Sequence, residues 1–130
     1  MSRLVLIVDD SPQMATNLEI ALLSMPEIEV AIAGTGLEAL RLLERTPIPV
    51  AAVVTDLEMP RMDGYELIER LRSDSRFAHL PIIVSSGSSD PETPERVLRL
   101  GADAFFTKPY SPVELKHRLE RLLHEKQEKL

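Results

Sequence analysis

The feature that most constrains the fold is an apolar run from Val50 to Thr55, which ends on the carboxylate of Asp56 and is stopped four residues later by Pro60. An unbroken run of β-branched and small residues is typical of a strand buried on both faces, as in a parallel sheet covered by helices. Asp56 is therefore expected at the carboxyl end of such a strand. Ligands bind at that edge of open α/β sheets, so a carboxylate there suits chemistry better than stability.

The rest of the chain alternates short apolar runs with longer segments of helical period. Further strands are predicted at Leu4–Val8, Ile28–Ala33, Ile82–Val84 and Asp103–Thr107. Helix starts are indicated by Ser11-Pro12, by Thr35 with Glu38, by Gly64 and by Ser111-Pro112 with Glu114. The first helix is expected to carry Met14, Leu18, Ala21, Leu22 and Met25 at helical spacing. A short fourth helix should end at Gly101, after a solvated loop from Ser85 to Pro94.

Strict alternation with short connections predicts right-handed crossovers and one α/β domain. The expected fold is flavodoxin-like and doubly wound, (βα)5, with a five-stranded parallel sheet in the order 2-1-3-4-5. In that order Asp9, Asp10, Asp56, Ser86 and Lys108 meet at one edge of the sheet.

Composition narrows the class of protein. A chain of 130 residues is long enough for one domain, and its net charge of −6 without a basic stripe disfavours direct nucleic-acid binding. Protein or cation partners are favoured instead. The chain has no cysteine, and its opening apolar run is too short for a signal peptide or a membrane span. A cytoplasmic location without membrane contact is therefore expected.

Convergence of the carboxylates at one edge has a chemical consequence. Asp9, Asp10 and Asp56 would repel one another unless a cation lies among them. Oxygen ligands without nearby His or Cys suit a magnesium ion (Mg²⁺). A carboxylate beside Mg²⁺, with Lys108 and the hydroxyl of Ser86 facing it, indicates phosphoryl transfer with Asp56 as the nucleophile.

These residues, in this order and each at a strand end, resemble the receiver domain of two-component response regulators over residues 3 to 124. The resemblance rests on Asp9-Asp10, Asp56-Leu57-Glu58-Met59-Pro60, Met62-Asp63-Gly64, Ser86-Gly87, Gly101-Ala102-Asp103 and Lys108-Pro109. It implies that Asp56 accepts phosphate from a histidine kinase or histidine phosphotransfer protein. Mg²⁺ would be bound at Asp56, directly by Asp10 and the backbone carbonyl of Glu58, and mainly through water by Asp9.

The resemblance also assigns roles around the phosphoryl group. Ser86 and Lys108 would contact that group, the Lys108-Pro109 bond would be cis, and the rotamer of Phe105 would follow phosphorylation. Three positions depart from the commoner pattern: Ser86 replaces Thr, Gly87 replaces Ala, and Phe105 replaces Tyr. None of these departures removes a chemical role.

By the same resemblance, the chain is a signalling switch that catalyses its own phosphorylation and dephosphorylation. It would change a surface formed by the fourth helix, fifth strand and fifth helix, which could also form a homodimer. The receiver domain is expected to span residues 1–124. The polar residues 125–130 would be a solvated helix end or the start of a linker to an effector or output domain.

Two alternatives stay open at this point. A small phosphatase with an aspartyl nucleophile would need a general acid two residues after Asp56, where the chain has Glu58, and a cap domain for which no residues remain. A degenerate receiver that binds partners without phosphorylation is disfavoured by the acidic pair, Ser86 and Lys108. Taken singly, an Asp-Asp pair after a strand is more often turn chemistry than a metal site.

Overall fold

The computed structural model describes the backbone of residues 1–128 and the side chains of residues 1–126. The strands are β1 (Arg3–Val8), β2 (Ile28–Ala33), β3 (Val50–Asp56), β4 (Ile82–Ser86) and β5 (Ala104–Thr107). The helices are α1 (Pro12–Leu22), α2 (Gly36–Arg45), α3 (Gly64–Ser73), α4 (Thr93–Arg99) and α5 (Pro112–Glu128). All strand pairs are parallel, in the order β2-β1-β3-β4-β5. The predicted flavodoxin-like fold is confirmed.

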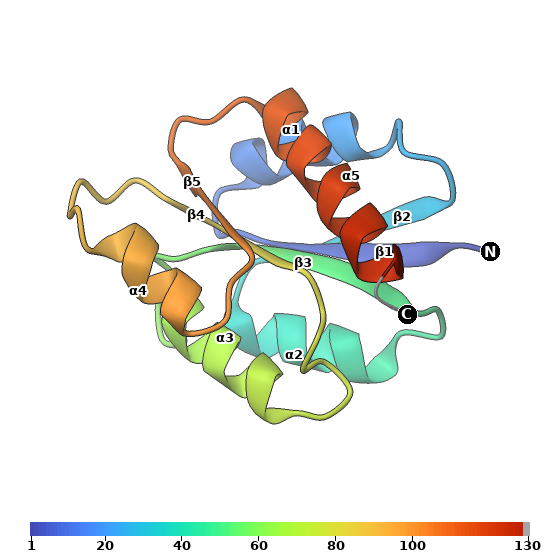
Figure 1. Ribbon diagram of the computed structural model, residues 1–130, viewed down its shortest axis with the longest axis horizontal. Coiled ribbons are helices and arrows are strands. Elements are labelled where there is room, and N and C mark those ends of the chain that lie inside the picture. The colour runs from blue at the N-terminus through green and yellow to red at the C-terminus, as the bar shows by residue number, and fades with distance from the viewer. Residues whose placement is uncertain (129–130) are drawn as a thin grey trace.

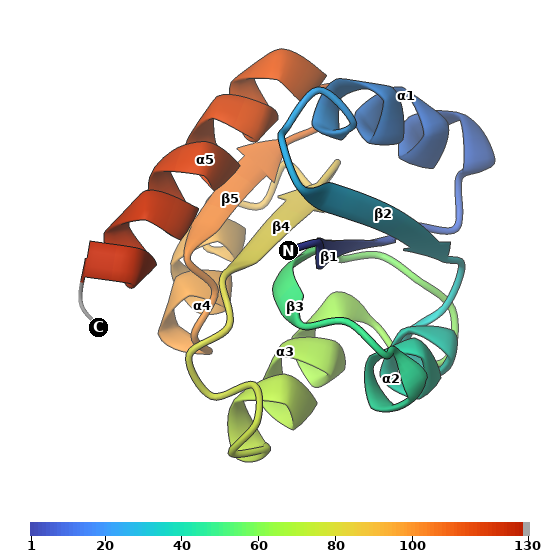
Figure 2. The same ribbon diagram turned by 90° about the vertical axis from the view of Figure 1, so that its right-hand side faces the viewer.

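The sheet separates two layers of helices (Figures 1 and 2). Helices α1 and α5 cover one face, and α2, α3 and α4 cover the other. Successive residues of β1 alternate between the two cores: Val5 and Ile7 pack toward α1 and α5, whereas Leu6 and Val8 pack toward α2 and α3. Because both faces are covered, the central strands are apolar almost throughout, as the unbroken run before Asp56 predicted.

Local capping explains where the helices begin. The side chains of Ser11, Thr35 and Asp63 accept hydrogen bonds from backbone N–H groups in the first turns of α1, α2 and α3. The capping box predicted for α2 is only half formed. Glu38 accepts from the N–H of Gly34 at 3.1 Å, one residue before the N-cap residue.

The predicted loop from Ser85 to Pro94 is wrong at both ends. Ser85 and Ser86 belong to β4 and are buried, because the backbone of Ser85 pairs with Asp56 and its carbonyl accepts from the N–H of Leu57 at 2.9 Å. At the other end, α4 already begins at Thr93. The end of a strand is thus hard to predict from the sequence where both residues of a pair across the sheet are polar.

Two other element boundaries differ slightly from the sequence prediction. Helix α1 ends at Leu22, so Met25 packs into the core from the turn that follows. Strand β5 begins at Ala104, because the carboxylate of Asp103 turns back to accept from the N–H of Ile82 at 2.8 Å. Helix α5 continues through residues 125–128, and the last two residues of the predicted polar end lie outside the described part.

Arg72 links several segments at the edge of the sheet opposite Asp56. Its guanidinium donates to the carbonyls of Gly101 and Phe77 and to the carboxylate of Asp103. Gly101 has a φ of 114°, and a side chain there would come within 2.9 Å of Arg72 Nε. Arg72 thereby ties α3 to the turn between α4 and β5.

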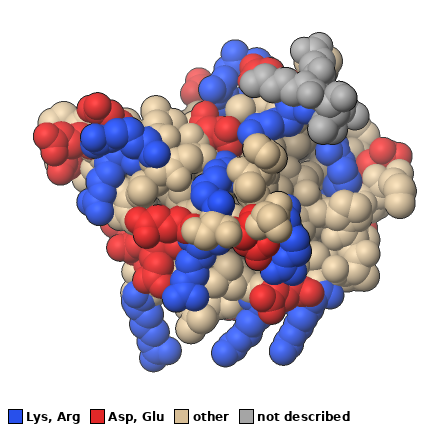
Figure 3. All heavy atoms as spheres, turned by 60° about the horizontal axis from the view of Figure 1, so that its bottom comes forward, with Lys and Arg blue, Asp and Glu red and all other residues tan. Residues whose placement is uncertain are grey.

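The surface carries charges of both signs. Over the face formed by α2 and α3, basic and acidic side chains are interspersed and do not gather into one basic patch (Figure 3). In residues 1–128, none of the helices combines the length and the apolar character that a membrane crossing requires.

Candidate functional site

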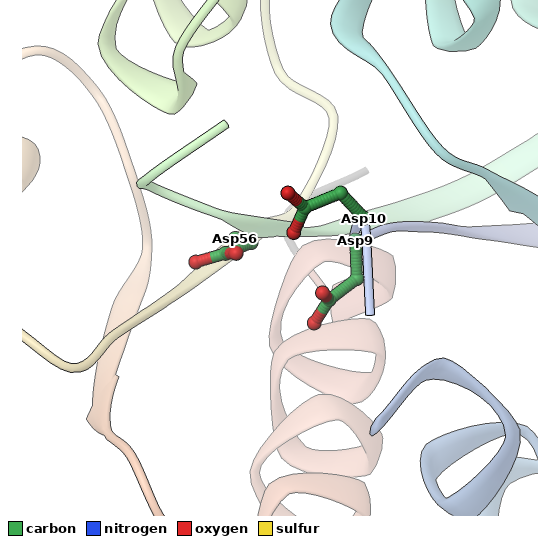
Figure 4. A group of neighbouring side chains, drawn as sticks. All are labelled: Asp9, Asp10 and Asp56. Atoms are coloured by element: carbon green, nitrogen blue, oxygen red, sulfur yellow. The ribbon is translucent and has the colours of Figure 1, made fainter. Parts of the chain in front are cut away.

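The carboxyl ends of β1 and β3 bring three carboxylates together (Figure 4). Asp9 and Asp10 follow β1 directly, and Asp56 is the last residue of the neighbouring β3. Each offers an oxygen atom, and these atoms lie within 4.8 Å of one another. Asp9 and Asp56 are buried, whereas Asp10 is exposed to solvent. Of the three residues, Asp10 is thus the most exposed to solvent.

Lys108, just after β5, lies against this acidic cluster. Its Nζ is 3.2 Å from Asp56 Oδ2 and 3.4 Å from Asp9 Oδ2, a contact between residues 99 positions apart in sequence. The backbone holds the lysine in place, because its N–H donates to the carbonyl of Ser86 at 2.8 Å. The Lys108–Pro109 peptide bond is cis.

The site holds more carboxyl groups than cationic groups, and the pKa values of Asp56 and Lys108 are shifted. Burial raises the pKa of the Asp56 carboxyl above its ordinary value, and the charge of Asp9 adds to the rise, although Lys108 opposes it. Burial by itself would lower the pKa of Lys108, but Asp56 and Asp9 outweigh this effect and the pKa is raised. Burial and the same two carboxylates also raise the pKa of Tyr110 to about 12. One ammonium thus leaves an excess of negative charge at the edge of the sheet.

This excess makes the cluster suitable for a divalent cation. All three clustered donors are carboxylate oxygens, the ligand type that Mg²⁺ prefers. Because Asp10 is exposed, a cation could also keep water molecules among its ligands, as Mg²⁺ usually does. The acidic cluster could hold a metal ion, and its chemistry fits Mg²⁺.

Ser86 lies at the end of β4 and is fully buried, and its hydroxyl donates to a residue outside the acidic cluster. Its Oγ donates to Oε2 of Glu58 at 2.6 Å, and the N–H of Gly87 donates to Oε1 of the same carboxylate at 3.1 Å. The sequence indicated a role for the Glu58 carbonyl only. Its side-chain contact depends on the path of the loop after β3, which no spacing in the sequence reveals.

Phe105 lies farther from the cluster, opposite Val84 in the pairing of β4 with β5. Its ring is partly buried and packs against the core beneath α2, α3 and α4, while the next residue, Phe106, packs against the other core. The structure therefore brings Asp9, Asp10, Asp56 and Lys108 into one site. Ser86 lies next to this site at the end of β4, and Phe105 lies farther away on β5.

Gly64 shapes the other side of the site. It opens α3, and a Cβ atom at this position would lie 2.7 Å from the carbonyl oxygen of Asp56 and 2.8 Å from Cα of Leu57. Its N–H donates to the carbonyl of Leu57 at 2.9 Å. Only glycine allows α3 to start so close to the end of β3, so this residue fixes the backbone that carries Asp56.

Fold and site together define a flavodoxin-like α/β domain with an acidic site and a lysine at the carboxyl edge of its sheet. Residues 5–120 match the response regulator receiver domain family. Chemotaxis protein CheY1 of Helicobacter pylori is 33% identical over 118 residues, which cover 91% of this chain and 94% of CheY1. A CheY-like receiver domain protein from Methanospirillum hungatei has a crystal structure that matches with a TM-score of 0.88 at 27% identity, over 100% of both chains.

The chain therefore belongs to the response regulator receiver domain family, whose members are signalling switches of two-component systems. Some relatives are longer. Response regulator Rre1 of Synechocystis is 32% identical over 122 residues, which cover 94% of this chain but 52% of Rre1. Hybrid signal transduction histidine kinase D of Dictyostelium discoideum is 36% identical over a segment that makes up 8% of its length. Receiver domains thus also occur as parts of histidine kinases.

Proposed function

We propose that this chain accepts a phosphoryl group on Asp56 from a histidine kinase or a histidine phosphotransfer protein. The observation that carries the proposal is the setting of Asp56, a buried carboxylate 3.2 Å from the ammonium of Lys108, in a cluster with Asp9 and Asp10. A carboxylate nucleophile beside a fixed positive charge suits phosphoryl transfer onto an aspartate, because catalysis of phosphoryl transfer is mostly positioning and charge stabilisation.

In the proposed reaction, an oxygen of Asp56 attacks the phosphorus atom of a phosphohistidine. A P–O bond forms as the P–N bond breaks, and the departing imidazole nitrogen takes a proton from solvent. Lys108, whose pKa is raised, stays protonated and offsets charge on the transferred oxygens. In dephosphorylation, water attacks the phosphorus, the P–O bond to Asp56 breaks, and inorganic phosphate and a proton leave. The domain catalyses both steps on itself.

The ion proposed for this site is Mg²⁺. Asp56, Asp10 and the backbone carbonyl of Glu58 would hold it directly, and Asp9 mainly through water. When bound, it supplies positive charge that offsets the charge of the phosphoryl oxygens.

Labelling with acetyl phosphate and Mg²⁺ tests the proposal without a kinase. Wild type should gain one phosphoryl group by mass spectrometry, whereas Asp56→Asn, which keeps the shape but lacks the nucleophile, should fold and gain none. Labelling of Asp56→Asn at the wild-type level would contradict the proposal. Rapid turnover of organic phosphates would favour an aspartyl phosphatase, and failure of wild type to label would favour a receiver that works without phosphorylation.

The proposed output surface comprises α4, β5 and α5. Ser86 pairs with Thr107 of β5, and Phe105 lies two residues earlier on that strand, so a change in the bonding of Ser86 occurs next to this surface. Phosphorylation is expected to change amide exchange there more than around α2. A larger change around α2 would count against this surface. An effector, an output domain or a second copy of the chain would bind here.

The proposed receiver unit spans residues 1–124, and residues 125–130 would lead from α5 toward a linker. This division is supported by the family match to residues 5–120 and by the polar composition of the last residues. A cytoplasmic location stays a prediction from the sequence.

A further inference from the structure

The carboxylate of Glu58 occupies two hydrogen-bond donors at the end of β4. Ser86 Oγ donates to one of its oxygens at 2.6 Å, and the N–H of Gly87 donates to the other at 3.1 Å. The first distance is that of a charge-assisted bond between a hydroxyl and an anionic oxygen. Both bonds cross between strand ends that are 28 and 29 residues apart in sequence, so they are tertiary contacts rather than turn geometry.

The hydroxyl of Ser86 has no donor capacity to spare. A serine hydroxyl carries one proton, and here that proton goes to Glu58, while the oxygen accepts from the N–H of Ser88 at 3.0 Å. Ser86 is fully buried, so its hydroxyl is not exposed to bulk solvent. Ser86 can therefore donate to an anionic group on Asp56 only after its hydrogen bond to the carboxylate of Glu58 has broken.

The side chain of Glu58 can move into solvent when it releases Ser86 and Gly87. Its side chain is exposed, and it follows Asp56 by two residues on the loop that leaves β3. The N–H of Glu58 donates to Oδ1 of Asp56 at 3.3 Å, so its backbone is held at the site independently of the side chain. The carboxylate therefore has a buried partner on one side and open solvent on the other.

We propose that the side chain of Glu58 is an internal competitor of the phosphoryl group: in the resting protein it occupies Ser86 and Gly87, and phosphorylation of Asp56 must displace it. This inference rests on the proposed function of Asp56. Glu58 is thus a positioning residue that holds Ser86 in the resting arrangement and weakens the site's affinity for an anion on Asp56. Since a charge-assisted hydrogen bond at a partly exposed site changes an equilibrium by roughly five- to tenfold, removal of the carboxylate should strengthen anion binding by that factor.

Beryllofluoride in the presence of Mg²⁺ is the probe, because it adds to an aspartate carboxylate and imitates its phosphorylated form. Its apparent Kd would be measured by calorimetry for wild type, Glu58→Ala and Glu58→Gln. Glu58→Ala should bind roughly five- to tenfold more tightly than wild type. Glu58→Gln, which keeps one acceptor oxygen without the charge, should lie between the two.

Asp63→Asn is the matched control for charge. Asp63 lies on the same loop and is exposed, and its carboxylate accepts from Glu66 in the first turn of α3 rather than from Ser86 or Gly87. Asn retains that cap, so this variant loses one negative charge and little else. It should change the Kd by less than about twofold, the effect of a screened surface charge. Equal effects of Glu58→Ala and Asp63→Asn would overturn the inference, because charge alone would then explain both.

A double-mutant cycle isolates the contact itself. In a Ser86→Ala background the main bond of Glu58 is absent and only its bond to Gly87 remains, so Glu58→Ala should there change the Kd less than it does in the wild-type background. An undiminished effect would overturn the proposal, as would weaker binding in Glu58→Ala. A second readout needs neither metal nor probe: amide exchange of Gly87 in the resting protein should accelerate in Glu58→Ala, and unchanged exchange would remove the contact on which the inference depends.

These outcomes separate the inference from the proposed function. If wild type and all variants fail to bind beryllofluoride, Asp56 is not an acceptor, and both proposals fall together. If wild type binds and labels normally but Glu58→Ala binds no more tightly, only the role of Glu58 is wrong.

Discussion

At Asp56, the fold keeps a carboxylate where burial and the neighbouring Asp9 both disfavour its charge. Lys108 reduces this penalty but does not remove it, since the pKa of Asp56 is raised even with the ammonium 3.2 Å away. Such a carboxylate is held in place by the rest of the structure rather than contributing to its stability.

Replacing Asp56 by Asn should therefore stabilise the metal-free protein near neutral pH. When the pKa of a carboxyl group is higher in the folded than in the unfolded state, the free energy of unfolding of the protein falls as pH rises from the unfolded pKa, about 3.9, to the folded pKa. Above the folded pKa the loss levels off. In acid below that pH window, urea unfolding with a metal chelator should give the same free energy of unfolding for wild type and Asp56→Asn. The variant should become the more stable as pH rises toward neutral. A difference that stays constant with pH would contradict this explanation.

At the scale of elements, the site depends on how closely α3 follows β3. The backbone of Gly64 lies where a methyl group would meet the carbonyl of Asp56 and Cα of Leu57, neither of which is a flexible side-chain end. Gly87, by contrast, follows β4 with open space around the position of a Cβ atom. The two glycines thus have opposite tolerance to substitution.

Gly64→Ala should destabilise the protein by about 1–3 kcal/mol, because the added methyl forces backbone shifts in a packed region. Gly87→Ala keeps the N–H that donates to Glu58 and should be neutral or stabilising by up to about 1 kcal/mol, through a less flexible unfolded chain. Urea unfolding measures both, and labelling with acetyl phosphate should suffer in Gly64→Ala alone. Similar losses in both variants would mean that close approach at Gly64 is not the cause.

The elements themselves could be predicted because their signals are local. The apolar run before Asp56 depends on neighbours within a few residues, and so do the helix starts predicted at Ser11, Thr35 and Gly64. Together these signals predicted the sheet order and the edge that carries the acidic cluster. The errors arose where a distant partner decides. Ser85 is a strand residue because Asp56 pairs with it, and the carboxylate of Glu58 binds Ser86 across two strand ends.

At the scale of the whole molecule, repulsion within the acidic cluster lowers the stability of the folded state, and a cation that binds only the folded state should raise it. For a site of millimolar affinity, about 10 mM Mg²⁺ would add on the order of 1 kcal/mol. In a domain of this size that raises Tm by about 3–5 °C. Thermal melts with and without Mg²⁺, at constant ionic strength to exclude general screening, measure the effect.

Asp10→Asn should lose most of this response, because Asp10 is the exposed carboxylate of the cluster and, under the proposed function, a direct ligand of Mg²⁺. The variant should fold, since the side chain of Asp10 is not part of either core. An equal rise in Tm in the two proteins would show that Asp10 does not bind the cation, and the proposed magnesium site would need other ligands.

The contact between Lys108 and Asp9 joins residues 99 positions apart, so nearly the whole chain must be in place before the site exists. A copy still being synthesised, or one truncated before β5, has the aspartate but not the lysine that completes its surroundings. Under the proposed function, such incomplete copies are phosphorylated inefficiently and do not signal. Phosphorylation is therefore restricted to molecules that have finished folding.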